Sequence, residues 1–286
     1  MKICFKCGGN YLEKQCPACN YKPDIINGFP AFAPSLAMKN DGFPPNAHDR
    51  LAKVEEGHFW FESRNRLIIW AIQKYFFKSV DFCEVGCGTG FVFSGIADAF
   101  PNLQLSGSEI YSEVLAFTQT RLPDAQLFQA DVCNFPFANE FDLIGAFDVL
   151  EHIEKDTLAL ENMYSALKPG GGVLITVPQH KWLWSVQDEI ACHKRRYARA
   201  DLIQKVEDTG FEILKVTSFI SLLLPLMFYS RLRMEKEKKE TITEEFQLSS
   251  VLNCCFSYIC SIERRIIQCG FGFPIGGSLL VIGRKK

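Results

Sequence analysis

Residues 81–90 of this 286-residue chain read Asp81-Phe82-Cys83-Glu84-Val85-Gly86-Cys87-Gly88-Thr89-Gly90 and are the clearest indication of its fold. An apolar run ends beside an acidic residue, and three alternating glycines follow before a helical pattern begins. Such a turn lets a ligand approach the backbone and presents helix N-terminal N–H groups to it. The third glycine, Gly90, comes one residue too early for the GxGxxG pattern of dinucleotide sites, which argues against a nicotinamide or flavin cofactor.

Short apolar runs alternate with amphipathic stretches downstream of this turn. The patterns predict strands over 81–86, 103–109, 125–130, 141–147, 172–178 and 211–219, with a last strand over 278–283. They predict helices over about 90–99, 112–121, 156–167 and 199–209, after a helical stretch at about 51–77. This alternation is typical of βαβ units, so we expect an α/β fold with a doubly wound, mostly parallel sheet that is covered on both faces.

Acidic residues stand where the predicted strands end. Glu109 ends the second strand, about 20 residues past the loop, where a carboxylate can accept both hydroxyls of a ribose. Asp131 and Val132 follow the third strand, where they could bind the exocyclic amine of a purine and cover its ring. The segment Asp148-Val149-Leu150-Glu151-His152 follows the fourth strand. In an open parallel sheet these strand ends meet at one crevice, so the sequence predicts a nucleoside-type ligand there.

Together with Leu167-Lys168-Pro169-Gly170-Gly171-Gly172, these segments resemble the class I S-adenosylmethionine-dependent methyltransferases, over about residues 55–218 and 276–286. The resemblance implies a Rossmann-like, seven-stranded sheet whose last strand is antiparallel. It implies that S-adenosyl-L-methionine is bound with its methionine part on the glycine loop, its ribose on Glu109 and its adenine at Asp131 and Val132. The full set of expected cofactor residues is Glu84, Gly86, Cys87, Gly88, Gly90, Glu109, Ile110, Asp131, Val132 and Asp148.

Two histidines are candidates for taking a proton from the acceptor during methyl transfer. His152 follows the fourth strand and His193 lies in the connection after the fifth, and imidazole titrates near neutrality. Hydrogen-bonded packing residues would explain both equally well. The motif from Asp148 to His152 is also similar to the acidic-plus-His motif of ubiquinone-type O-methyltransferases, where it can hold a divalent cation. Many relatives carry Glu-His at this place without a metal.

The connection after the fifth strand also supplies candidates for binding the acceptor: His180, Trp182, Arg195, Arg196 and Tyr197. Two adjacent arginines could pair with a phosphate or carboxylate of the acceptor. A solvated, basic start to the helix at 199–209 would account for the arginines as well.

Cys4, Cys7, Cys16 and Cys19 have the spacing CxxC-x8-CxxC. Each pair can chelate one ion from a tight turn, and two pairs complete a tetrahedral four-sulfur shell, so we expect a structural Zn²⁺. The surrounding block holds too few apolar residues to fold unaided. We expect the other eight of the 12 cysteines to be reduced thiols of a cytoplasmic protein, because the N-terminus shows no apolar signal core.

Composition divides the chain into five expected segments. These are a zinc ribbon at 1–35, a linker and N-terminal helical segment at 36–80, a methyltransferase core at 81–219, a helical insertion at 220–275 and the last core strand at 276–286. The insertion joins an apolar block, a cation-rich segment and a nearly apolar helix, and such a composition needs a partner surface. A lid over the acceptor is favoured; a homodimer face and peripheral membrane contact through 219–240 are the alternatives.

These observations predict a methyltransferase acting on a small-molecule or lipid- or sugar-linked acceptor, by O- or N-methylation. One alternative is an RNA methyltransferase that uses the zinc ribbon for RNA contact. The chain has 31 basic and 33 acidic residues, and its net charge of -2 argues against a nucleic-acid partner. The other alternative is a non-catalytic scaffold that binds S-adenosylmethionine without turnover.

Overall fold

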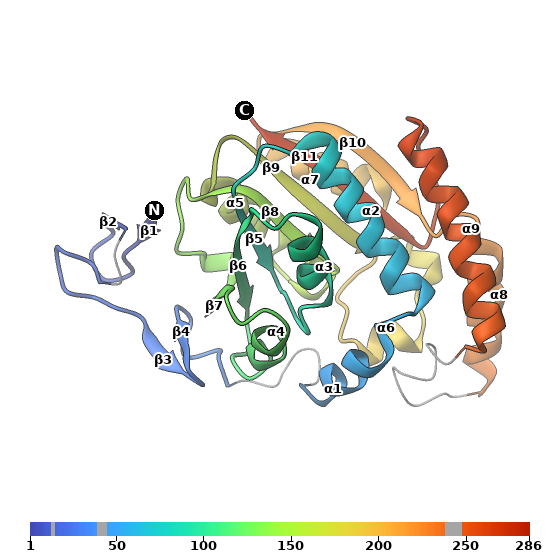
Figure 1. The fold of residues 1–286 in the computed structure, drawn as a ribbon, viewed down its shortest axis with the longest axis horizontal. Coiled ribbons are helices and arrows are strands. Elements are labelled where there is room, and N and C mark those ends of the chain that lie inside the picture. Colours follow the sequence, from blue (N-terminus) through green and yellow to red (C-terminus); the bar gives the residue numbers. More distant parts are fainter. Residues whose placement is uncertain (13–14, 39–44, 238–247) are drawn as a thin grey trace.

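The computed structural model describes residues 1–12, 15–38, 45–237 and 248–286. Its main sheet has nine strands in the order β10-β11-β9-β8-β5-β6-β7-β4-β3 (Figure 1). The seven core strands are β5 (Asp81–Val85), β6 (Gln104–Glu109), β7 (Gln126–Gln129), β8 (Phe141–Phe147), β9 (Leu167–Pro178), β10 (Phe211–Phe219) and β11 (Ser278–Lys285). β5 to β9 are parallel to one another, and β11 is antiparallel to both β9 and β10. The doubly wound, mostly parallel sheet is thereby confirmed.

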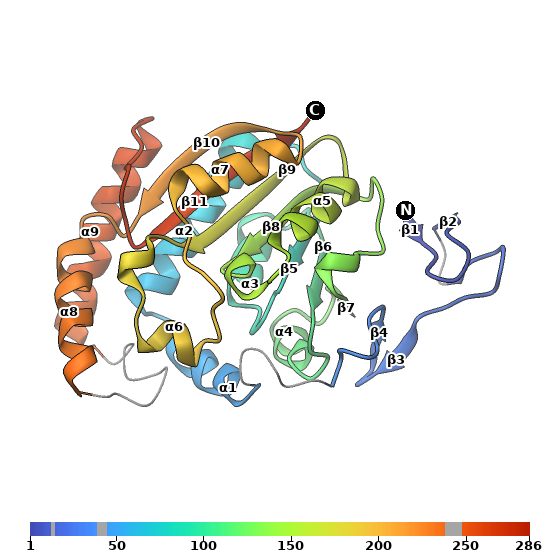
Figure 2. The same cartoon turned by 180° about the vertical axis from the view of Figure 1, so that it is seen from behind.

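Helices cover both faces of this sheet, as near-continuous apolar strands require (Figures 1 and 2). One face carries α2 (Phe59–Tyr75) and α3 (Phe91–Ala99), and the other carries α5 (Asp156–Ala166) and α7 (Arg199–Asp208). Successive residues of β5 point to opposite faces: Phe82 packs with Ile68 of α2, whereas Cys83 packs in the cluster that holds Leu160 of α5. α4 (Leu115–Arg121) lies between β6 and β7 in the chain.

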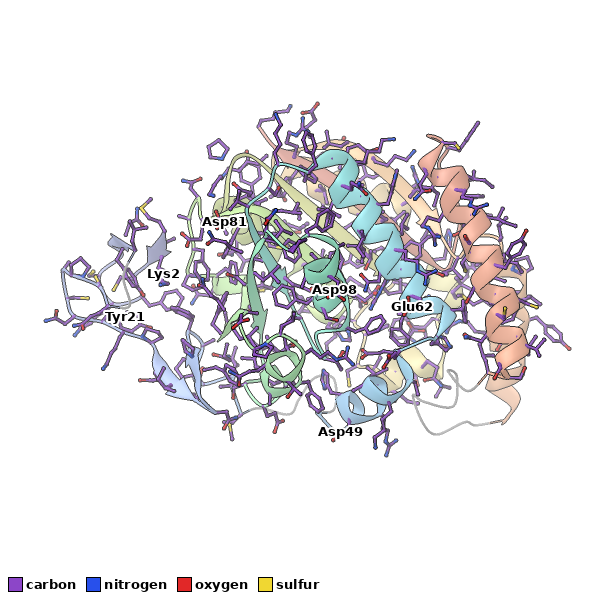
Figure 3. All side chains as sticks on the ribbon, viewed as in Figure 1. Lys2, Tyr21, Asp49, Glu62, Asp81 and Asp98 are labelled. Carbon is purple, nitrogen blue, oxygen red and sulfur yellow. The ribbon has the colours of Figure 1, made fainter. Side chains whose placement is uncertain are left out.

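The predicted elements differ from the observed ones in two places. The helical stretch expected at 51–77 is divided into α1 (Pro45–Val54) and α2, because Gly57 has a φ of +73° and the His58 ring caps α2 by accepting from the Trp60 N–H. β9 begins at Leu167 and not at residue 172, since Leu167 already pairs with Phe141 of β8. At the amino ends of β5 and β9, Nζ of Lys168 lies 2.6 Å from Oδ2 of Asp81, a residue that is labelled in Figure 3.

The N-terminal block contributes two hairpins. β1 (Lys2–Ile3) pairs with β2 (Asn10–Tyr11) around the four cysteines, and β3 (Asp24–Ile26) pairs with β4 (Phe29–Ala31). β4 adds parallel to β7, where the Gln129 side chain bonds both the N–H and the carbonyl of Ala33 at 3.0 Å. The sheet therefore has two strands more than the seven expected, because part of the block expected to form the ribbon extends the core.

The insertion forms α8 (Leu224–Glu237) and α9 (Ser250–Gln268). α9 packs beside α2, and Asn253 of α9 accepts from the Phe59 N–H at 2.8 Å (Figure 1). None of the helices within the described ranges is long and apolar enough to cross a bilayer. The cation-rich part of the insertion beyond residue 237, and the segment of the expected linker at 39–44, lie outside the described residues.

Candidate active site

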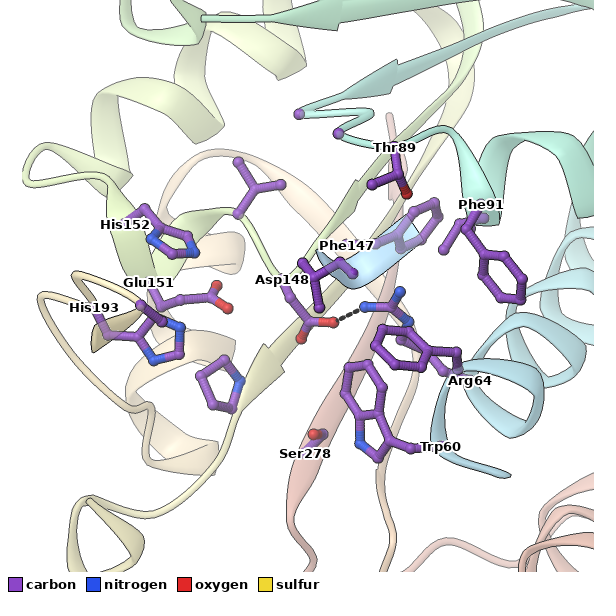
Figure 4. Close-up of a pocket in the computed structure, with 18 of the residues that line it drawn as sticks. Trp60, Arg64, Thr89, Phe91, Phe147, Asp148, Glu151, His152, His193 and Ser278 are labelled. Atoms are coloured by element: carbon purple, nitrogen blue, oxygen red, sulfur yellow. Dashed lines mark hydrogen bonds and ion pairs between the residues drawn. The ribbon is translucent and has the colours of Figure 1, made fainter. Parts of the chain in front are cut away.

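A cavity of about 790 Å³ opens where the parallel core strands end (Figure 4). Nine of the ten expected cofactor residues line it, the exception being Gly90, together with both candidate catalytic histidines. The short connections that contribute to the lining are η1 (Val132–Asn134), η2 (Leu150–His152) and α6 (Val186–Ile190), whereas η3 (Lys181–Leu183) contributes no residue to it. The residues that sequence reasoning gathered at one crevice are thus close together in space.

The glycine loop between β5 and α3 has a steric reason for its glycines. A Cβ at Gly86 would lie 2.6 Å from Val149 Cγ2, which is far inside van der Waals contact. Gly90 caps α3 with a φ of +76°, and a Cβ there would meet Thr118 at 3.0 Å. Gly90 therefore shapes the turn. The absence of a side chain at Gly86 lets Val149, two residues after β8, approach the loop closely.

A half-buried carboxylate, Glu109, and a buried one, Glu84, lie beside this loop. Glu109 accepts the N–H groups of Gly88 at 3.2 Å and Ile110 at 2.7 Å, although burial raises its pKa on balance. Burial also raises the pKa of Glu84 well above its usual value, against the opposing charge of Arg64. Oε2 of Glu84 has no hydrogen-bond partner among the described residues. A buried carboxylate oxygen of this kind is stabilised only by a donor or a cation, so this end of the cavity suits a positively charged group.

Asp131 and Val132 form the neighbouring part of the wall. Asp131 caps η1 by accepting the Cys133 N–H at 2.8 Å, which fixes the backbone after β7. Val132 is buried beside it and gives the wall an apolar surface. Ile110, at the end of β6, lines the same part of the cavity.

The residues that follow β8 line a further part of the cavity. Asp148 has a φ of +58° and forms an ion pair with Arg64 of α2 (Figure 4). Glu151 is only 1 % exposed, and burial together with the charge of Asp148 raises its pKa well above the usual value. Burial and the neighbouring His193 lower the pKa of His152 to about 3, so its imidazole is neutral. The rings of His152 and His193 lie 4.8 Å apart between their centroids.

Asp188 of α6 contacts His193 and two arginines. Its Oδ1 lies 2.8 Å from Nδ1 of His193 and accepts the Arg196 Nε–H at 2.7 Å, while Arg231 of α8 lies 3.5 Å from Oδ2. Burial opposes ionisation, but His193 and the two arginines outweigh it and hold the pKa of Asp188 well below its usual range. Asp188 is therefore a buried anion that fixes the ring of His193.

Sequence reasoning placed Arg64 on a helix that either crosses the cofactor crevice or simply packs on the sheet, but it missed Asp188 and the pairing of Arg64 with Asp148. A Ser-x-x-Asp capping box at Ser185 and Asp188 marks the start of α6, but it does not indicate that the carboxylate also faces His193. Arg64 belongs to a helix far from the strand ends in sequence, and no local pattern relates it to Asp148.

Four of the five expected acceptor-binding residues lie outside the cavity lining. Arg195 and Tyr197 turn instead to Asp156, at 2.9 and 2.7 Å, where Tyr197 is fully buried. His180 stacks on Trp182, whose side chain is 54 % exposed on the surface. Arg196 does line the cavity, but its guanidinium is bound to Asp188. The structure therefore does not bring His180, Trp182, Arg195 and Tyr197 to the site, because buried anions and surface stacking hold them elsewhere.

The insertion supplies much of the remaining lining. It contributes Ile220, Leu223, Leu226, Met227, Ser230 and Arg231 from the α8 region and Leu248 and Phe256 from the α9 region. Most of these side chains are apolar. The part of the cavity that the insertion lines is accordingly mostly hydrophobic.

The four N-terminal cysteines form a second cluster, in which each Sγ lies within 4.8 Å of the others. Cys4 Sγ is 3.4 Å from Cys19 Sγ, and Cys7 Sγ is 3.6 Å from Cys16 Sγ. These distances exceed the roughly 2.05 Å of a disulfide and suit thiolates around one ion with Zn–S bonds of about 2.3 Å. Desolvation raises the pKa of Cys4, but the N–H groups of Cys7 and Lys6 outweigh it and lower the pKa to about 7. The cluster therefore fits Zn²⁺.

Comparisons with known proteins agree with this geometry. A family model described as a methyltransferase domain matches residues 83–173. A Mycolicibacterium smegmatis protein named for S-adenosylmethionine-dependent methyltransferase activity is 24 % identical over 163 residues, which is 56 % of this chain and 62 % of the relative. A malonyl-[acyl-carrier protein] O-methyltransferase from Ilyobacter polytropus is 22 % identical over 48 % of this chain and 54 % of its own length. The chain thus spans less than two thirds of these curated relatives.

Solved structures show the same fold. A Haloferax volcanii methyltransferase in complex with the Trm112 methyltransferase activator superposes with a TM-score of 0.55 at 16 % identity, covering 86 % of this chain and 96 % of that one. Haemonchus contortus phosphoethanolamine N-methyltransferase 2, in complex with S-adenosyl-L-methionine, gives 0.51 at 22 % identity over 76 and 52 %. The family match, the sheet order and the glycine loop together identify the core of this chain as a class I S-adenosylmethionine-dependent methyltransferase domain.

Proposed function

We propose that this protein transfers the methyl group of S-adenosylmethionine to an oxygen or nitrogen of a small-molecule or lipid- or sugar-linked acceptor. One observation carries the proposal: the glycine loop and the Asp188–His193 pair line the same cavity. A cofactor on the loop and an acceptor beside His193 would therefore meet within one enclosed space, as in-line displacement requires.

The cofactor would occupy the half of the cavity that contains the loop. The unpartnered Oε2 of Glu84 would receive the α-amine of the methionine part, and Glu109 would accept the ribose hydroxyls. Asp131 would bind the adenine amine while Val132 and Ile110 cover the ring. When bound, S-adenosylmethionine supplies an activated methyl group, so the protein mainly aligns the acceptor and manages its proton.

The acceptor would occupy the other half, beneath the insertion. The apolar lining from α8 and α9 supports the lid role for the insertion and suits an acceptor with an apolar part. In the transfer, the acceptor heteroatom forms a bond to the methyl carbon while the sulfur–carbon bond breaks, leaving S-adenosylhomocysteine. A proton on Nδ1 of His193, held by Asp188, leaves Nε2 able to take the acceptor proton.

The named relatives support a small acceptor. They include trans-aconitate 2-methyltransferases, with 28 % identity over 34 % of this chain in the Variovorax paradoxus protein, and the malonyl-[acyl-carrier protein] enzyme. An acceptor of the size of trans-aconitate is small enough to share a cavity of about 790 Å³ with the cofactor, and of a malonyl-[acyl-carrier protein] only the malonyl end would enter it.

Calorimetry with S-adenosylmethionine and S-adenosylhomocysteine tests the cofactor part of the proposal. We expect both ligands to bind, and a protein that binds neither of them would overturn the proposal. Incubation of the protein with metabolite extract and methyl-labelled cofactor, followed by mass spectrometry, should then identify the acceptor. His193→Ala should slow labelling at least tenfold, whereas Lys194→Ala, an exposed neighbour, should not change it. Cofactor binding with no labelled product would favour the scaffold alternative.

The N-terminal cluster would hold one structural Zn²⁺ on four thiolates, with no open position for catalysis. Metal analysis of the purified protein should give one zinc per chain. The double variant Cys4→Ser/Cys16→Ser should lose it, and Cys254→Ser/Cys255→Ser, on the exposed side of α9, should retain it. Equal zinc contents in the two variants would contradict the assignment.

A further inference from the structure

The side chains of Glu151, His152 and His193 lie close together at one side of the cavity (Figure 4). One ligand atom from each lies within 4.8 Å of the other two. Glu151 and His152 belong to η2 after β8, whereas His193 comes from the connection after β9, some 40 residues along the chain. Two imidazoles and one carboxylate on one side of a cavity are the donor set of open transition-metal sites.

Glu151 gives an independent indication that a ligand binds here. Its side chain is 1 % exposed, and its Oε2 has no hydrogen-bond partner among the described residues. Removing a carboxylate oxygen from water without a partner is costly, and an adjacent cation removes that cost.

The two histidines are oriented as metal ligands are. Asp188 lies 2.8 Å from Nδ1 of His193, which places the lone pair on Nε2 when Nδ1 carries the proton. His152 is hydrogen bonded to the backbone of Ala191. A carboxylate or carbonyl behind each imidazole fixes its tautomer and raises its basicity, and this arrangement is found around most histidine-bound metals.

Asp148, which the sequence motif would include among the ligands, is engaged elsewhere. It forms an ion pair with Arg64 of α2, and the guanidinium also lies 4.5 Å from the Trp60 ring centroid. The third ligand is therefore supplied by His193, which no local motif connects to Glu151.

We propose that Glu151, His152 and His193 bind one divalent transition-metal cation whose open positions face the acceptor half of the cavity. Binding of the cation needs only these residues and Asp188. If the proposed methyl transfer is also correct, an acceptor oxygen completes the coordination. A divalent cation would lower the pKa of an acceptor hydroxyl that it binds, so the hydroxyl would lose its proton to solvent before methyl transfer, and His193 would act as a ligand in place of its role as proton acceptor.

Mn²⁺ is the appropriate probe because it prefers nitrogen and oxygen donors, and the Cys4 cluster offers only thiolates. The full chain, loaded with one equivalent of Zn²⁺, is titrated with Mn²⁺ while the electron paramagnetic resonance signal of the unbound ion is followed. We expect one bound Mn²⁺ per chain. Wild-type protein that binds no Mn²⁺ at millimolar concentration overturns the proposal.

Variants locate the site. His193→Ala and Glu151→Gln should each weaken Mn²⁺ binding at least tenfold, and Asp188→Asn should weaken it by roughly 10- to 100-fold through His193. The matched controls are Lys194→Ala and Glu154→Gln, whose exposed side chains neighbour the same ligands in sequence. Circular dichroism confirms that each variant is folded. Unchanged affinity in a folded His193→Ala protein would place the metal elsewhere.

This titration is independent of the methyl-transfer proposal. Mn²⁺ bound by a chain that fails to bind S-adenosylmethionine would retain the metal site and remove the proposed function. If the protein instead binds the cofactor and turns over without binding Mn²⁺, the proposed function would stand and the metal site would be removed.

Discussion

Arg64 of α2 forms a largely buried ion pair with Asp148, just after β8, so a helix outside the sheet is joined to the strand end at the cavity that both residues line. Side-chain exposures are 9 % for Arg64 and 19 % for Asp148, so the pair is largely shielded from solvent. Removing the guanidinium would leave Asp148 uncompensated beside Glu151, whose pKa the charge of Asp148 already raises.

We therefore expect Arg64→Met to lower the free energy of unfolding by about 2–3 kcal/mol. Urea denaturation measures the change. The double variant Arg64→Met/Asp148→Asn should recover part of the loss, because it removes the unpaired charge. Equal losses in the single and double variants would show that the packing of Arg64, and not its charge, matters.

Glu109 should be needed for cofactor binding. Its carboxylate holds the N–H groups of Gly88 and Ile110 and faces the cavity, so Glu109→Ala would both loosen the loop and remove the ribose acceptor. We expect S-adenosylhomocysteine to bind at least tenfold more weakly by calorimetry, a cost of about 1.4 kcal/mol or more. Glu113→Ala, at an exposed position just after the same strand, is the control and should leave the affinity unchanged. Wild-type affinity in the Glu109 variant would refute this role.

Asp156 should make the fold sensitive to acid. Burial opposes its ionisation, but hydrogen bonds from Lys205, Tyr197 and Arg195 outweigh it and lower its pKa. Because the folded-state pKa lies below the unfolded value of about 3.9, the carboxylate contributes stability at neutral pH, and this contribution is lost as the pH falls through that value toward the folded-state pKa.

Asp156→Asn should therefore lose about 1–3 kcal/mol of stability at pH 7. The difference between wild type and variant should shrink as the pH is lowered from 5 to 3, as followed by urea denaturation. Asp201→Asn, with a side chain that is 55 % exposed on the neighbouring helix, provides the comparison and should behave as wild type. A difference that does not depend on pH would contradict this origin of the stability.

Glu263 of α9 should stabilise the turn at residues 220–222, which precedes α8. Its carboxylate accepts the N–H groups of Ile220, Ser221 and Leu222 at 2.6, 2.6 and 2.8 Å, where Ile220 has a φ of +56°. Glu263→Gln replaces one accepting oxygen by a donor, so we expect a loss of about 2–3 kcal/mol.

Hydrogen exchange provides the local readout for this prediction. The amides of residues 220–222 should exchange at least tenfold faster in Glu263→Gln, while Glu212→Gln, exposed on β10, should leave them unchanged. Protection equal to wild type would show that this carboxylate does not hold the turn.

The features that sequence reasoning predicted correctly are those encoded by neighbouring residues. The alternation of strands and helices follows from burial patterns within single segments, and the glycines at 86 and 90 follow from a turn that needs a close approach and a positive φ. The spacing of Cys4, Cys7, Cys16 and Cys19 likewise indicates a common ligand without any knowledge of the fold. In each case the physical cause acts over a few residues along the chain.

Local sequence patterns were therefore sufficient to predict the class of fold, the glycine loop and the clustering of the four cysteines. Which polar side chains meet in the cavity follows only from the three-dimensional arrangement of the elements. Tyr197 turned to Asp156, His193 to Asp188 and Arg64 to Asp148, and β4 extended the sheet beside β7. A buried charge binds the nearest compensating partner in space, and that partner belongs to a segment brought close only after the sheet has formed.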